Sequence, residues 1–152
     1  MINLKILNKK AIKEILKKVK EQWDADVDFG DKVFLQDKEN DIYIVNKDIS
    51  KIDLSKLRIN SIGLYIAQQM IDGLRLSIEG SQLIGPKAKK NVLELGEKQA
   101  KEWLKGYDLE NDKSLRGFLI IKHKEDFLGC GKAKDNKILN YVPKNRRLKI
   151  SA

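Results

Sequence analysis

The chain has 152 residues, of which 41% are hydrophobic and 35% are charged, and its 31 Lys and Arg against 22 Asp and Glu give a net charge of +9. This composition is typical of a globular protein with a heavily charged surface and argues against intrinsic disorder. No apolar run approaches the roughly 20 residues of a membrane span, and the first residues lack the apolar core of a signal peptide. A single cysteine, Cys130, excludes an internal disulfide framework. We therefore expect a cytoplasmic protein of one or two small domains.

The positive charge is concentrated in the second half of the sequence. Residues 1–76 hold 14 Lys and Arg and 12 Asp and Glu, a net of +2, whereas residues 77–152 hold 17 and 10, a net of +7. Lys and Arg clearly outnumber Asp and Glu there, and this excess of positive charge favours contact with a polyanion such as nucleic acid. The alternative is a Lys-rich surface that only interacts with solvent.

The first half predicts a helix followed by strands. Apolar residues recur at helical spacing over 8–23, and Asn8 can cap this helix; it is either an ordinary helix lying on a sheet or a basic helix for RNA or membranes. The acidic loop that follows has calcium-like spacing, but Leu35 stands where that motif needs Glu. Further along, the pattern predicts a hairpin of strands 32–36 and 41–46, an irregular or helical piece at 48–57, a strand or helix at 61–70, and a strand at 74–78. We place a domain boundary near residue 73, giving domains 1–73 and 74–152 packed as one rigid body.

The second half predicts short strands with one or two small helices. Pro86 suits the first turn of a short helix, and a strand at 92–95 precedes a helix at 97–105 that Gly106 ends. Residues 116–122 are apolar on both faces, which indicates a central strand or part of a closed barrel. This spacing predicts a small mixed barrel, and so an α+β fold for the chain.

The stretch 127–148 combines glycines with a basic end. An apolar strand contains Gly129 and Gly131, turns at Asp135, and is followed by a second strand at 138–142. Glycines allow another backbone or a ligand to come very close. From residue 132 to the end there are seven Lys and Arg against one acid. We predict that this hairpin and its tail form a surface for phosphates.

Catalytic and metal-binding patterns are weak or missing in the sequence. His123 is the only histidine and lies between two lysines near a strand end, so an exposed structural role is favoured over catalysis. Cys130 between two glycines is better explained by packing than by nucleophilic chemistry. The sequence has no metal-ligand spacing, phosphate loop or dinucleotide fingerprint. We expect no catalytic residues, no metal and no cofactor.

Four segments form a recognisable set: AKEWLKG at 100–106, RGFLII at 116–121, LGCGK at 128–132 and ILNYVPKNRR at 138–147. Together they resemble the PUA domain, an RNA-binding pseudobarrel, and most closely the C-terminal domain of Sun-family RNA cytosine-5 methyltransferases. The upstream part, 8–85, is similar in layout to the domain that precedes the PUA module in Nip-family ribosome-biogenesis proteins. The resemblance implies an N-terminal α/β pre-PUA-like domain packed on a C-terminal PUA-like β pseudobarrel.

The resemblance also implies a set of RNA-binding residues. In PUA domains RNA lies along the glycine-containing loop and hairpin and against basic residues at the C-terminal end. The matching positions here are Gly129, Gly131, Lys132, Lys144, Asn145, Arg146 and Arg147. The basic stretch with Lys87, Lys89 and Lys90 extends this track if it folds alongside. Tyr141 either stacks on an unpaired base or is buried in the barrel.

A methyltransferase domain is lacking in the sequence. The expected function is that of a stand-alone, non-catalytic RNA-binding protein in rRNA or tRNA modification or ribosome biogenesis. RNA is the expected partner, with a separate RNA methyltransferase or a ribosome-assembly factor beside it. The alternative is a protein–protein adaptor whose basic face meets an acidic partner. An enzyme that uses Cys130 or His123 is a weaker third hypothesis.

Overall fold

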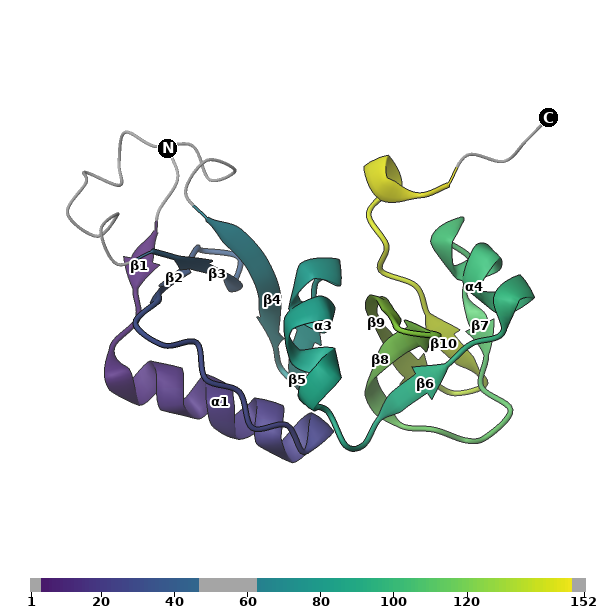
Figure 1. Ribbon diagram of the computed structural model, residues 1–152, viewed down its shortest axis with the longest axis horizontal. Helices are drawn as coiled ribbons and strands as arrows, with labels where there is room; N and C mark the ends of the chain where they lie inside the picture. The colour runs from purple at the N-terminus through teal and green to yellow at the C-terminus, as the bar shows by residue number, and fades with distance from the viewer. Residues whose placement is uncertain (1–3, 47–62, 149–152) are drawn as a thin grey trace.

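A computed structural model describes residues 4–46 and 63–148, so the piece predicted at 48–57 lies outside the described residues. Two five-stranded sheets are seen within these ranges, ordered β1-β2-β3-β4-β5 and β6-β8-β9-β10-β7 (Figure 1). The first sheet contains β1 (Lys5–Ile6), β2 (Val33–Gln36), β3 (Asp41–Val45), β4 (Leu64–Met70) and β5 (Gly73–Leu76). The second contains β6 (Val92–Glu94), β7 (Leu109–Glu110), β8 (Gly117–His123), β9 (Asp126–Lys134) and β10 (Lys137–Leu139). Helices α1 (Lys9–Trp23), α3 (Ile78–Ile84) and α4 (Glu97–Leu104) and the 3-10 helices η3 (Gly85–Lys87) and η4 (Lys144–Arg146) complete the described fold. The predicted α+β class with a PUA-like half-barrel is confirmed.

Helix α1 begins and ends as its sequence predicts. The Asn8 side chain accepts a hydrogen bond from the Ala11 N–H at 2.8 Å, which satisfies one of the free donors at the helix start. At the other end Trp23 is fully buried, and its indole N–H donates to the Phe118 carbonyl oxygen at 3.1 Å. The helix therefore lies on the first sheet and is tied by its last residue to a strand of the second.

Strand β8 is buried on both faces. Phe118 and Ile120 pack into the core that also contains Trp23, whereas Leu119 and Ile121 pack into a second core around Trp103. The strand pairs with β6 in parallel and with β9 in antiparallel orientation. This confirms the prediction of a central strand with two apolar faces.

Helix α3 was not predicted from the sequence. The strand expected at 74–78 ends at Leu76, and Ser77 caps a helix by accepting a hydrogen bond from the Gly80 N–H at 3.0 Å. Gly80 is buried inside this helix, and a Cβ there would overlap the carbonyl oxygen of Ile66 in β4. Glycine therefore allows close packing of α3 on the sheet, although it resembles a helix breaker in the sequence.

The first sheet contains a segment on the C-terminal side of the proposed domain boundary. Residues 73–76 form β5, which pairs with β4 through the register Met70 to Gly73 and Ala67 to Leu76. A boundary at 73 would separate two hydrogen-bonded strands, so the pairing favours a boundary after β5. The exact division stays a prediction. Residues of both halves share the core around Trp23, so the two sheets are packed against one continuous apolar cluster.

Replacing Gly80 by Ala tests the packing of α3. In an exposed helix this change stabilises by about 1 kcal/mol, but here the added methyl group meets the Ile66 carbonyl, so we expect a loss of roughly 1–3 kcal/mol in unfolding free energy. Urea denaturation measures the difference. Gln82→Ala, on the exposed side of the same helix, is the matched control and should change stability by less than about 0.5 kcal/mol. A Gly80→Ala protein as stable as wild type would contradict this packing.

Candidate nucleic-acid interface

The basic C-terminal segment is anchored to helix α4. The Asn140 amide donates to the carbonyl oxygens of Trp103 at 2.8 Å and Tyr107 at 2.9 Å, and its side-chain oxygen accepts from the Val142 N–H at 2.7 Å. Farther on, the Leu148 N–H donates to the Leu104 carbonyl oxygen at 2.8 Å. These bonds hold the intervening η4 in a defined position at the surface.

The predicted basic residues of this segment have different surroundings. Lys144 and Asn145 are exposed on η4. Arg146 forms a salt bridge with Glu79 of α3. Arg147 donates from Nε to the Val142 carbonyl oxygen at 2.9 Å and fills the space that a side chain at position 106 would occupy. Arg147 therefore has a structural contact that the sequence did not indicate.

The two glycines of β9 are buried against the protein itself. Gly129 has a φ of +111°, and its N–H donates to the Ser81 hydroxyl at 3.0 Å. A Cβ on Gly131 would lie 2.7 Å from Ile138 Cγ2 and 2.8 Å from a ring carbon of Trp103. The predicted close approach is real, but the atoms that approach Gly131 belong to the core and not to a ligand. This corrects the role proposed for Gly131.

Lys132 is paired across the two halves. Its ammonium forms a salt bridge with Asp72, in the turn between β4 and β5, and lies 5.5 Å from the ring centroid of Phe118. The hydrogen bond with Asp72 raises the pKa of Lys132 and lowers the pKa of the Asp72 carboxyl, because each charge stabilises the other. An RNA phosphate would have to compete with this carboxylate.

The stretch with Lys87, Lys89 and Lys90 does not extend the C-terminal track. These three lysines are exposed, and the Lys89 N–H donates to the Trp23 carbonyl oxygen at 2.9 Å, at the end of α1. Figure 1 shows η3 and the chain leading to β6 at the lower edge of the molecule, whereas η4 lies at the upper edge. The condition that the two segments fold alongside each other is therefore not met.

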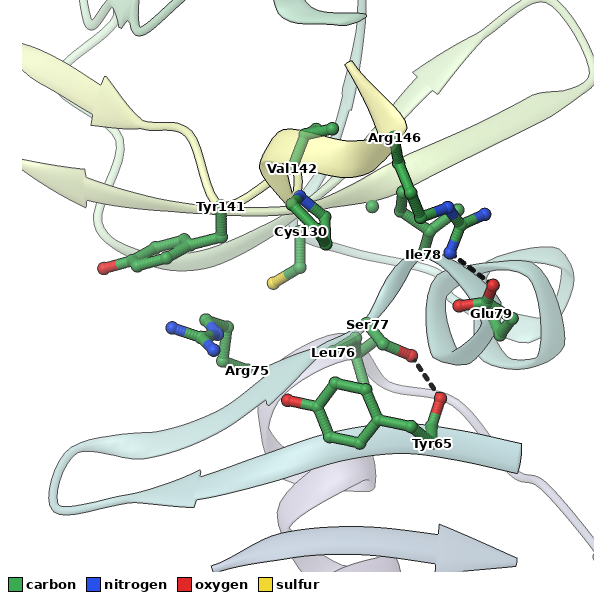
Figure 2. Close-up of a pocket in the computed structure, with 12 residues that line it drawn as sticks. Tyr65, Arg75, Leu76, Ser77, Ile78, Glu79, Cys130, Tyr141, Val142 and Arg146 are labelled. Atoms are coloured by element: carbon green, nitrogen blue, oxygen red, sulfur yellow. Dashed lines mark hydrogen bonds and ion pairs between the residues drawn. The ribbon is translucent and has the colours of Figure 1, made fainter. Parts of the chain in front are cut away.

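A pocket of about 100 Å³ opens where the two halves meet, and we call it the seam pocket (Figure 2). Twelve residues line it: Tyr65, Arg75, Leu76, Ser77, Ile78, Glu79, Gly129, Cys130, Tyr141, Val142, Pro143 and Arg146. The Arg75 guanidinium carbon lies 4.3 Å from the centroid of the Tyr141 ring, a cation–π arrangement. Tyr141 is therefore neither buried in the barrel nor fully free. Sequence reasoning missed Arg75 because nothing in its local pattern connects β5 to position 141.

Groups with nucleophilic or acid–base chemistry are poorly placed for it. Cys130 is buried, and burial raises the pKa of its thiol to about 12. The ring Nδ1 of His123 lies 2.8 Å from the Leu95 carbonyl oxygen. Residues 4–46 and 63–148 contain no group of three or more His, Cys, Asp or Glu side chains arranged to hold a metal ion. In the same ranges no helix is long and apolar enough to cross a membrane.

The raised thiol pKa predicts a loss of stability in mild alkali. The unfolded thiol titrates near 9.0 and the folded one near 12, so the stabilisation is complete below pH 9 and is lost as the pH rises toward 12. Between pH 8.5 and 10, wild type should lose about 1 kcal/mol more unfolding free energy than Cys130→Ala, measured by urea denaturation at each pH. Parallel declines in the two proteins would contradict the assignment.

The C-terminal half of the chain is similar to a known family of domains. Residues 90–148 match the family model described as the methyltransferase RsmF PUA domain. Among relatives named ribosomal RNA small subunit methyltransferase F, the protein of Vibrio parahaemolyticus is 27% identical over 143 residues, covering 90% of this chain and 29% of the relative. The protein of Vibrio vulnificus is 24% identical over 137 residues, covering 90% and 28%. The protein of Aeromonas hydrophila is 32% identical over 90 residues, covering 59% and 19%.

The chain thus spans less than a third of the length of these relatives. The two Vibrio alignments extend well upstream of residue 90, so they include most of the first sheet as well. The resemblance of this upstream part to Nip-family proteins stays a prediction. Residues 90–148 are thus similar to the PUA domain of these methyltransferases, in agreement with the resemblance found in the sequence to the C-terminal domain of Sun-family RNA cytosine-5 methyltransferases.

Proposed function

We propose that this chain is a cytoplasmic RNA-binding protein that acts in ribosomal RNA modification or ribosome biogenesis. The observation that carries the proposal is the match of residues 90–148 to the PUA domain of a ribosomal RNA methyltransferase. The net charge of +7 in residues 77–152 supports it, because neutralising phosphates releases counterions and favours binding. The chain holds a structured RNA by its shape and backbone charge.

The exposed residues of η4 make the first contacts with phosphate in this proposal. Lys144 is exposed and Asn145 offers an amide donor beside it. The Arg146 side chain is 41% exposed, and its planar guanidinium can form two parallel hydrogen bonds to one phosphate. Because Asn140 anchors this segment to α4, the three side chains are presented without a large cost in ordering the backbone.

The proposal assigns no chemical step to the described residues. Cys130 is protonated and buried at neutral pH, and His123 contacts a backbone carbonyl oxygen. Any modification of the bound RNA then belongs to a methyltransferase acting beside this chain, or to a ribosome-assembly factor that receives the RNA. Gly129, Arg147 and Lys132 support the binding surface through their contacts with the protein, and Lys144, Asn145 and Arg146 face the RNA.

Two acidic residues that precede the PUA-matching range compete with the RNA. Asp72 pairs with Lys132, and Glu79 pairs with Arg146, so both carboxylates hold cations of the second half. A phosphate that binds either cation must displace the carboxylate or bind beside it. These two carboxylates thereby lower the affinity for phosphate and limit non-specific binding to any polyanion.

Replacing Lys144 and Arg146 tests the proposed surface. The double variant Lys144→Ala/Arg146→Gln should bind a structured ribosomal RNA fragment more weakly, and the slope of log K against log salt should fall by about 1.4–1.8, since each lost phosphate contact contributes about 0.7–0.9. Filter binding at several salt concentrations measures both quantities. The control Lys13→Ala/Lys17→Ala removes two exposed charges from α1 and should leave the slope unchanged. Equal effects of the two variants would favour a generic charged surface and the adaptor hypothesis.

Neutralising the competing acids should have the opposite effect. Asp72→Asn/Glu79→Gln frees Lys132 and Arg146, so we expect about two- to tenfold tighter binding to the same RNA at low salt. The comparison includes Glu97→Gln/Asp112→Asn, which changes the net charge equally at exposed sites away from these cations. Equal gains in the two variants would mean that only net charge matters.

A further inference from the structure

We propose that the seam pocket binds a single unpaired nucleotide of the RNA, with its base against Arg75 and Tyr141 and its phosphate near Arg146. The inference rests on the proposed function and adds to it a defined subsite for one nucleotide. It uses a residue, Arg75, that lies outside the PUA-matching range. The pocket is therefore a composite of both halves of the chain.

One end of the pocket is suited to a planar ring. The Arg75 guanidinium lies over the Tyr141 ring at 4.3 Å, and the Tyr65 hydroxyl faces Arg75 from the other side (Figure 2). Burial raises the pKa of Tyr65 to about 12, and a hydrogen bond with Arg75 opposes that rise, so the hydroxyl stays protonated. Aromatic rings and guanidinium planes are the surfaces on which proteins stack unpaired bases. Among the described residues Arg75 forms no direct salt bridge, and the carboxyl that acts on its charge, Asp41, is hydrogen-bonded to the Tyr65 hydroxyl.

The opposite end of the pocket is suited to an anion. Figure 2 shows Arg146 on the far side of Cys130 from Arg75, with its guanidinium turned toward Glu79. Arg146 presents N–H donors that can bind a phosphate, and one of them, on Nη1, is paired with the Glu79 carboxylate. A nucleotide has a matching arrangement, because its flat base and its charged phosphate lie at opposite ends of one sugar.

The floor between the two ends is uncharged. Leu76, Cys130 and Val142 are each buried, and the Cys130 sulfur points into the space between Tyr141 and Ser77 (Figure 2). A protonated thiol and two aliphatic side chains carry no charge, so they form an apolar surface on which a neutral base can lie. The Ser77 hydroxyl already donates to the Tyr65 carbonyl oxygen at 2.6 Å, which fixes its position on the wall. A volume of about 100 Å³ has room for several waters, which an entering planar group would displace.

The test compares two RNA hairpins that differ by one bulged nucleotide. Wild type should bind the bulged hairpin more tightly than the fully paired one. Tyr141→Leu and Arg75→Gln should each weaken binding to the bulged hairpin roughly 5- to 150-fold while binding to the paired hairpin changes much less. Tyr107→Leu and Arg116→Gln, exposed residues outside the pocket, are the matched controls. The paired hairpin also serves as the check that each variant is folded.

A second measurement uses the unchanged protein. A 4-thiouridine placed at the bulge and irradiated should cross-link to a peptide containing Tyr141, Arg75 or Tyr65, identified by mass spectrometry. Cross-links found only elsewhere, or equal loss of binding to both hairpins in Tyr141→Leu, would overturn the pocket while leaving the proposed RNA binding intact. Failure of wild type to bind either hairpin would instead overturn the proposed function and the pocket together.

Discussion

Burial of β8 on both faces determines how the two halves of this chain are held together. Phe118 and Ile120 share a core with Trp23 at the end of α1, while Leu119 and Ile121 share a core with Trp103 of α4. Sliding or rotation of one sheet would pull alternate side chains of this strand out of one core or the other. The indole N–H of Trp23, which donates to the Phe118 carbonyl oxygen, adds a buried directional contact to this packing.

This shared packing places charged and aromatic side chains from distant parts of the chain against one another. Asp72 and Glu79, which precede the PUA-matching range, pair with Lys132 and Arg146 inside it, and Arg75 lies against Tyr141. Charge separations of a few ångströms have large effects only where the geometry is maintained. Carboxylates therefore partly neutralise Lys132 and Arg146, whereas Arg75 adds a positive charge beside Tyr141. In all three cases the two partners are distant in sequence.

Helix α3 links these features. The Ser81 hydroxyl accepts the N–H of Gly129 in β9, and Gly80 brings the helix against β4. Glu79 at its first turn reaches Arg146, and Ser77 at its cap lines the seam pocket. A seven-residue helix thus positions contacts to both sheets and to the C-terminal segment, so the proposed binding surface combines residues from distant parts of the chain.

Local patterns in the sequence were enough to predict α1, the β2–β3 hairpin, α4, and the strands β8 and β9, because periodicity and capping depend on neighbours within a few residues. The same reasoning missed α3, since Gly80 is favourable there only because Ile66 lies against it. For the candidate site, the sequence predicted the basic residues of the C-terminal segment as RNA contacts, and this stays a prediction. It also assigned a ligand contact to Gly131, where core atoms lie, and joined Lys89 to a distant track.

The sequence by itself determined the net charge and its distribution along the chain, the amphipathic faces and the PUA-type segments. Only the tertiary structure decided which cations meet carboxylates, which glycines meet the core, and that Arg75 stacks on Tyr141. The physical reason is range: helix and strand patterns arise from contacts a few residues apart, whereas ion pairs and pockets arise from contacts between segments that the packing around β8 brings together.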